Sequence, residues 1–120
     1  MQSIHKMSLN SPWFELVISG KKRYEGRRLT EKMKSINLND IIIFSHYADP
    51  SKEQFKAKVT SIQIFPTFEI ALSNLPINEV LPIEDITLEK GIDIYKKYVS
   101  INTQNKDGVC MIGIKLINDI

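Results

Sequence analysis

The chain has 120 residues, of which 42% are hydrophobic and 25% are charged, and its formal net charge is +2. These values describe one globular domain with a core of its own and exclude a disordered chain. The single cysteine, Cys110, excludes an internal disulfide and a thiolate metal cluster, and the small positive charge permits a nucleic-acid partner without requiring one.

The first elements expected along the chain are a strand and a short helix. Residues 3–9 alternate weakly between two faces, which predicts a strand with His5 on its more apolar side. Ser11 and Pro12 are typical of a helix N-cap and of the first helical position. Gly20 is a natural left-handed stop for this helix. Its apolar positions have helical spacing and are Trp13, Phe14, Leu16, Val17 and Ile18.

Three more strands are expected before the middle of the chain. Residues 23–29 form the first of them, and residues 41–44, which read Ile-Ile-Ile-Phe, form a buried one. Residues 55–65 alternate and predict a longer strand. Between these strands, residues 32–36 predict a turn or a short helical piece, and the Asn and Asp residues of 37–40 are typical of a turn.

The second half of the chain predicts two helices and a last strand. Residues 67–75 place their apolar side chains on one helical face, and Pro76 ends that helix. Thr87 is typical of a cap for a second helix over residues 88–99. A turn at Asp107 and Gly108 then leads into a strand over residues 109–117.

This order of elements favours an α+β fold. Strands joined by short turns, with few helices between them, indicate a small mixed or antiparallel β-barrel rather than a doubly wound parallel sheet. About three helices are expected to pack on it. No linker, repeat or low-complexity tract interrupts residues 1–120, so we expect a single domain.

Several functional classes find no support in the sequence. It has no apolar run of membrane-spanning length and no apolar signal core, so a cytoplasmic location is expected by default. It has no Gly-rich phosphate loop and only two histidines, His5 and His46. We therefore expect neither a metal site nor a cofactor.

The most informative segment is the charged stretch over residues 20–27. Glu25 and Arg27 are two residues apart on a predicted strand, so their side chains point to the same face. With Lys22 close behind, they form a polar group that can bind a nucleobase or a phosphate. An ordinary solvated strand edge would have the same sequence, so both interpretations stay open at this point.

The run Trp13–Arg27, WFELVISGKKRYEGR, resembles the start of the ASCH (activating signal cointegrator homology) domain. In that family a helix ending in I-x-S/N-G-x-K precedes an E-x-R strand. Residues 36–44, INLNDIIIF, resemble the family's second motif, with Asn39 in place of its usual glycine. Residues 89–98 resemble its last helical segment, so the likeness extends over nearly the whole chain.

This resemblance implies a PUA-like fold and a cleft that binds RNA or nucleotides. The cleft would be lined by the glycine–lysine loop, here Lys21 and Lys22, and by the strand that carries Glu25 and Arg27. Tyr98 is the better cleft candidate of the two tyrosines near the end of the last helix.

Some relatives in this family are enzymes, namely an amidohydrolase that acts on N4-acetylcytidine and a ribonuclease. Lys22 matches the catalytic lysine of the amidohydrolase branch. Glu25 stands where that branch has threonine, and Glu79 is the chief weak match for its catalytic glutamate. If the protein is an enzyme, Lys22 and Glu25 are therefore its expected catalytic residues.

Other roles stay open on the sequence alone. His46 follows the buried strand and is either a proton shuttle near the cleft or a surface histidine in a loop. Trp13 and Phe14 either stack on bases or belong to the core. Cys110 lies in an apolar run and is expected to be a buried thiol. The protein as a whole is a nucleotide- or RNA-binding module, a small hydrolase of a modified nucleoside, or a structural domain.

Overall fold

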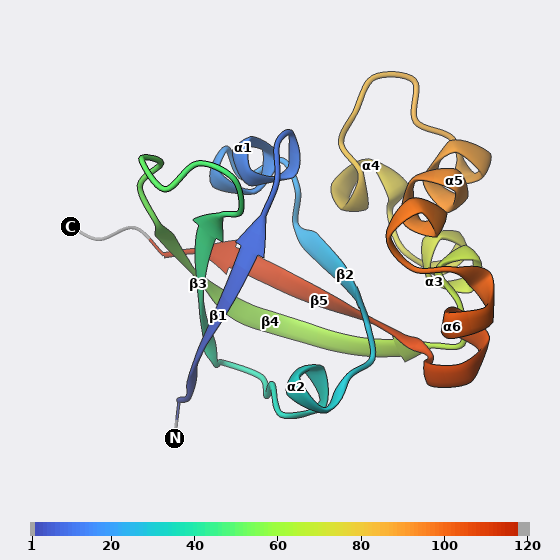
Figure 1. Cartoon of the computed structure of the whole chain (residues 1–120), viewed down its shortest axis with the longest axis horizontal. Helices are drawn as coiled ribbons and strands as arrows, with labels where there is room; N and C mark the ends of the chain where they lie inside the picture. The colour runs from blue at the N-terminus through green and yellow to red at the C-terminus, as the bar shows by residue number, and fades with distance from the viewer. Residues whose placement is uncertain (1, 118–120) are drawn as a thin grey trace.

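Figure 1 shows the computed structural model, which describes residues 2–117. Within this range the chain forms five strands, β1 (Ile4–Leu9), β2 (Tyr24–Arg28), β3 (Ile41–His46), β4 (Phe55–Phe65) and β5 (Val109–Leu116). The same range forms six helices, α1 (Trp13–Ile18), α2 (Glu31–Lys34), α3 (Phe68–Asn74), α4 (Ile77–Val80), α5 (Leu88–Tyr98) and α6 (Ile101–Asp107). None of these helices is long and apolar enough to cross a membrane.

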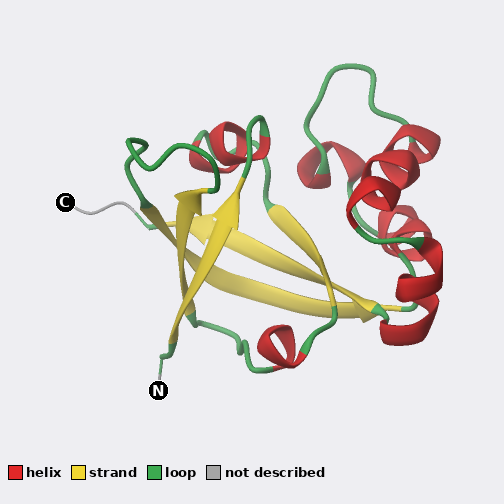
Figure 2. Ribbon diagram, viewed as in Figure 1, coloured by secondary structure: helices red, strands yellow, loops and turns green. Residues whose placement is uncertain are grey.

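The strands form one sheet in the order β1-β3-β4-β5-β2. β1 runs parallel to β3, and the other neighbours are antiparallel, so the sheet is mixed. The sheet curls into a half-barrel, which Figure 2 shows in yellow. The expected barrel is therefore open rather than closed, because β1 pairs with β3 and β2 pairs with β5, and β1 and β2 form the two edges of the sheet. This architecture is compatible with a PUA-like fold.

The helices are more numerous than the three that the sequence predicts. Thr87 caps α5 as expected, and Thr67 caps α3, where the sequence placed the first residue of the helix; each hydroxyl accepts a bond from the backbone N–H three residues later, at 3.2 and 3.3 Å. The short helices α4 and α6 were not expected. Helix α6 is mostly polar, so it has no apolar periodicity from which it could be predicted. It begins at the N-cap Ser100, whose hydroxyl accepts a 3.2 Å bond from the Thr103 N–H.

The start of α1 corrects one sequence prediction. Pro12, not Ser11, is the N-cap residue, and no side chain caps this helix. The Ser11 hydroxyl instead lies 2.9 Å from Nε2 of His46. The end of the helix follows the prediction, since Gly20 adopts a positive φ of 81°.

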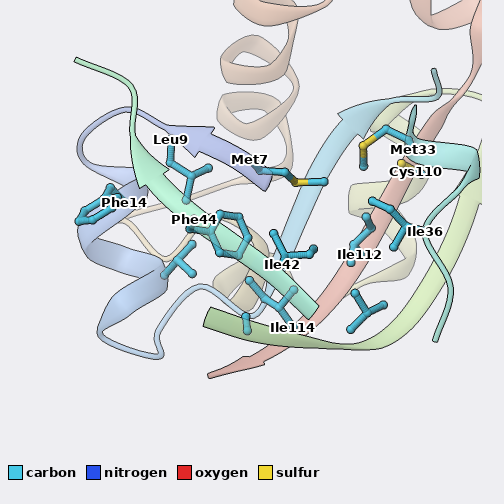
Figure 3. Packing of buried hydrophobic residues seen from close by; sticks show 13 residues of the cluster. Met7, Leu9, Phe14, Met33, Ile36, Ile42, Phe44, Cys110, Ile112 and Ile114 are labelled. Carbon is cyan, nitrogen blue, oxygen red and sulfur yellow. The ribbon is translucent and has the colours of Figure 1, made fainter. Parts of the chain in front are cut away.

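One hydrophobic cluster fills the concave side of the half-barrel, and Figure 3 shows it from close by. Phe14 of α1 closes one end of it and packs edge-on against Phe55, with ring centroids 5.2 Å apart. Cys110 lies in this cluster and is buried, as predicted. Burial raises the pKa of its thiol to about 11, so Cys110 is a packing residue rather than a nucleophile.

A second cluster packs α3 and α5 against the other face of β5 and β2. Its centre is the stacked pair Phe68 and Tyr95, whose ring centroids are 4.0 Å apart. These rings lie directly over Gly26, where a Cβ atom would be 2.8 Å from Oη of Tyr95 and 2.9 Å from Sδ of Met111. Only glycine lets the helices come this close to β2, and this contact sets the position of α5.

The buried carboxylate of Asp40 ties the start of β1 to the turn before β3. It accepts bonds from the backbone N–H groups of Ser3 and Asn37, at 3.0 and 2.9 Å, and lies 2.8 Å from Nε2 of His5. The hydrogen bond with His5 makes the largest contribution to lowering the pKa of Asp40 to about 2. Asn39 next to it adopts a positive φ of 72°, in keeping with the predicted turn.

We expect Asp40→Asn to lower the urea midpoint of unfolding at pH 7, because the amide cannot accept all three bonds. The pKa of Asp40 in the folded protein lies below the ordinary value of 3.8, so its charge stabilises the fold above about pH 4. That contribution is lost as the pH falls toward about 2, where wild type and variant should converge. Asp93→Asn is the control, because Asp93 is an exposed residue of α5. A gap between wild type and Asp40→Asn that stays constant from neutral to strongly acidic pH would contradict this account.

Candidate functional site

A cleft of about 680 Å³ follows the gap between the two edge strands. Strand β1 supplies one wall, β2 lies at its base, and α5 and the start of α6 face them. It is lined by Met7, Ser8, Leu9, Asn10, Trp13, Lys22, Glu25, Gly26, Arg27, Arg28, Thr30, Lys32, Met33, Tyr47, Phe68, Leu81, Ile94, Tyr95, Tyr98, Val99, Ser100 and Thr103. Glu25 is the only carboxylate among these residues, and four of them are cations.

Glu25 and Arg27 share one face of β2, as their spacing predicts. Nε and Nη2 of Arg27 donate to Oε2 of Glu25 at 3.1 and 2.9 Å, and the Glu25 side chain is only 7% exposed. Nη2 of Arg27 also donates to the carbonyl of Ser8 at 2.9 Å. Arg27 therefore neutralises the buried carboxylate and bridges the gap from β2 to β1.

Lys32 makes a second bridge across the same gap. Its Nζ donates to the carbonyl of Lys6 at 2.5 Å. The carbonyls of Lys6 and Ser8 lie two residues apart on β1, so both point to the same edge of the strand. Two cationic side chains thus take the place of a neighbouring backbone at this edge.

Lys22 is buried at the inner end of the cleft, with 3% of its surface exposed. Its Nζ donates to the carbonyl of Val80, lies 3.9 Å from Oε1 of Glu25, and sits 5.5 Å from the centroid of the Trp13 ring. Burial lowers the pKa of Lys22 to about 8, Glu25 acts in the opposite direction, and Arg27 adds to the lowering. A useful fraction of this amine is therefore neutral at mildly alkaline pH.

Aromatic side chains line the space next to these charges. The indole N–H of Trp13 donates to Oη of Tyr98 at 3.1 Å, which joins α1 to α5 beside the cleft. Tyr95 lines the cleft as well, and burial raises the pKa of its phenol far above the ordinary value, so it stays protonated. The sequence left open whether Trp13 and Phe14 belong to the core or stack on bases. In the structure Phe14 lies in the core, whereas Trp13 lines the cleft.

Four of the residues predicted for the site line one cleft, namely Lys22, Glu25, Arg27 and Tyr98. Lys21 and His46 are not among the residues that line it. The Lys21 side chain is exposed next to buried Lys22. Glu79 also lies outside the lining and pairs with Arg23 at 3.6 Å, so the carboxylate of the cleft is Glu25.

His46 holds the loop after β3 together. Its Nδ1 accepts bonds from the backbone N–H groups of Ala48 and Asp49, both at 3.1 Å. The neutral ring therefore carries its proton on Nε2 and donates it to the Ser11 hydroxyl, 2.9 Å away. Both ring nitrogens are thus engaged in hydrogen bonds that order this loop. This arrangement fits the second of the two interpretations of His46, a surface histidine in a loop, rather than a proton shuttle.

Sequence reasoning missed the contributions of β1 and α6 to the cleft. The Ser8 carbonyl, Ser100 and Thr103 belong to segments that carry no functional signal of their own. Tyr95, which the sequence made the weaker cleft candidate of the two tyrosines, lines the cleft together with Tyr98. Across residues 2–117, no group of three or more His, Cys, Asp and Glu side chains is placed to hold a metal ion.

The fold that carries this cleft is shared by ASCH domains. The ASCH domain model matches residues 7–118, and the chain belongs to this family. The resemblance found in the sequence motifs is thereby confirmed.

Solved structures agree with this assignment. Hypothetical protein PH0355 is 32% identical, with a TM-score of 0.83 over 96% of this chain and 100% of that one. Protein PF0455 from Pyrococcus furiosus is 28% identical, with a TM-score of 0.75 over 98% and 100%. ASCH from Zymomonas mobilis shares the fold at 18% identity, with a TM-score of 0.65 over 94% and 71%. No curated protein matches the chain.

The lowered pKa of Lys22 makes the free energy of unfolding depend on pH. Charged Lys22 opposes folding below about pH 8, and this opposition fades as the pH rises toward the ordinary pKa of 10.5. The gap between these values corresponds to about 3 kcal/mol. We therefore expect the free energy of unfolding of Lys22→Met, relative to wild type, to fall by up to that amount across this range, measured by urea denaturation.

Lys21→Met is the matched control, because Lys21 is adjacent and exposed. Its free energy of unfolding relative to wild type should not change with pH. Parallel curves for Lys22→Met and wild type from neutral pH to pH 10.5 would mean that Lys22 is not buried as described.

Proposed function

We propose that this protein binds RNA or a nucleotide by holding one base in the cleft beside Glu25. The observation that carries this proposal is the buried Glu25 carboxylate, which Arg27 fixes from one side while its other oxygen is directed toward Lys22. A carboxylate held in this way accepts hydrogen bonds from the amino edge of a base. Burying a carboxylate costs free energy, and a smaller apolar residue would fill this position without that cost. Recognition of a ligand therefore accounts for a glutamate here.

The charges of the cleft support a base rather than a phosphate next to Glu25. A phosphate would be repelled by that carboxylate, whereas a neutral base would not. Arg28 and Lys32 line the part of the cleft away from Lys22, and Arg28 is exposed with its guanidinium 3.6 Å from Asp107. A phosphate bound there would leave the base free to reach Glu25.

The aromatic residues of the cleft suit the same ligand. Tyr47 and Tyr98 are 73% and 64% exposed at its rim, and Trp13 is half-buried between Tyr98 and Lys22. Exposed aromatic faces beside hydrogen-bonding groups are the usual means by which proteins hold unpaired bases. We therefore favour single-stranded RNA or a free nucleotide over a double helix.

A second function has one specific observation in its favour. Lys22 and Glu25 lie 3.9 Å apart in one cleft, and the pKa of Lys22 is lowered to about 8, as a hydrolase of an acylated nucleoside would need. Against it, Glu25 replaces the threonine of the amidohydrolase branch, and Glu79 lies outside the cleft lining. Binding without chemistry thus has the stronger support.

Glu25→Gln tests the binding function. It keeps the shape of the side chain and removes the charge, so we expect it to fold and to bind at least about tenfold more weakly, or roughly 1.4 kcal/mol. Fluorescence anisotropy with a labelled mixed-sequence single-stranded RNA, and calorimetry with the four nucleoside monophosphates, would measure this at low and high salt. Glu31→Gln is the control, since the Glu31 side chain is 93% exposed. Equal affinities for both variants and wild type would remove Glu25 from the site.

A turnover assay separates the two functions. N4-acetylcytidine is incubated with wild type and with Lys22→Met, and released cytidine is followed by liquid chromatography. If the protein only binds, wild type should produce no more cytidine than the variant does. Cytidine release by wild type alone, rising as the pH passes about 8, would establish the hydrolase instead, because the neutral amine of Lys22 becomes abundant there.

A further inference from the structure

The Lys22 amine is covered even though its side chain belongs to the cleft wall. Three groups interact with it, namely the carbonyl of Val80, the carboxylate of Glu25 and the face of Trp13. Glu25 and Val80 are themselves buried and packed against the sheet. Trp13, which is half-buried and belongs to a short helix, is the neighbour best able to move away from the amine.

One exposed hydrogen bond ties Trp13 to α5, in addition to its packing at the edge of the second cluster. Its indole N–H donates to Oη of Tyr98 at 3.1 Å, and within residues 2–117 this is the only hydrogen bond that joins α1 to α5. Tyr98 is 64% exposed, so water can replace it as the acceptor at little cost. Trp13 packs against the edge of the second cluster but is not one of its buried residues, so its release leaves the buried residues of both cores in place.

We propose that Trp13 and Tyr98 form a gate over the Lys22 amine and determine which ligands reach it. With the gate closed, a ligand in the cleft reaches Glu25 and Arg27 but not the Lys22 amine. A planar heteroaromatic base whose ring nitrogen or carbonyl accepts the indole N–H replaces Tyr98 and opens the inner end of the cleft. The ligand class rests on the proposed function, whereas the gate itself can be tested without any ligand.

The chain offers close controls for such a test. Lys21 is the exposed neighbour of Lys22 and reports the reactivity of an uncovered amine in the same molecule. Tyr47 is a second exposed tyrosine of the cleft, 73% exposed, and its hydroxyl is not bonded to Trp13. Trp13 is the only tryptophan of the chain, so its fluorescence reports this position alone.

The test measures how fast limiting acetic anhydride acetylates Lys22 and Lys21, by peptide mass spectrometry, in wild type, Tyr98→Phe and Tyr47→Phe. In wild type we expect Lys22 to react at least about tenfold more slowly than Lys21, as a covered group does. Tyr98→Phe keeps the ring but loses the acceptor. It should raise the ratio of the Lys22 rate to the Lys21 rate at least about threefold and increase acrylamide quenching of Trp13, a local opening without global unfolding.

Tyr47→Phe should behave like wild type in both measurements. An unchanged ratio in Tyr98→Phe, or an equal rise in Tyr47→Phe, would overturn the gate. Adenosine and cytidine monophosphates should then quench Trp13 emission where ribose 5-phosphate does not. If none of the three quenches it while Tyr98→Phe still frees Lys22, the gate stands and the nucleotide-binding function fails.

Discussion

Strand β2 pairs with the sheet along one edge only, and the cleft exists because of this. Its hydrogen bonds go to β5, and the opposite edge faces the gap where a closed barrel would have β1 as a neighbour. Closing that gap with a backbone ladder would fill the space that Glu25 and Arg27 now line. The gap is spanned by side chains instead, chiefly the guanidinium of Arg27, which reaches the Ser8 carbonyl.

The two faces of the five-residue strand β2 make different contacts. Glu25 and Arg27 project toward the gap, while Gly26 between them presents bare backbone to Tyr95 and Phe68. The missing side chain brings α5 close enough for its tyrosines to line the cleft, and the flanking side chains supply the charge. The E-G-R sequence thus allows the close packing of α5 and supplies the charged lining of the cleft at once. Neither role would survive a shift of one residue in register, because every side chain would then change faces.

The features that could be predicted from the sequence are those that depend on residues close together in the chain. The Thr87 cap, the long strand to Phe65, and the common face of Glu25 and Arg27 all rest on spacings of a few residues. The cleft itself was only partly predictable. Trp13 and Tyr98 meet across 85 positions and Lys22 and Val80 across 58, and no local pattern encodes such contacts. Helix α6 escaped prediction for another reason, since its buried residue is the polar Gln104, which binds the backbone N–H of Phe68.

The edge carbonyls of β1 have a consequence for how this protein behaves at high concentration. An unpaired strand edge is a template on which another molecule can add a strand, the first step toward aggregation. Here Lys32 and Arg27 already occupy the carbonyls of Lys6 and Ser8, and they surround that edge with positive charge. The same two cations that span the gap thus also disfavour the addition of another strand at this edge.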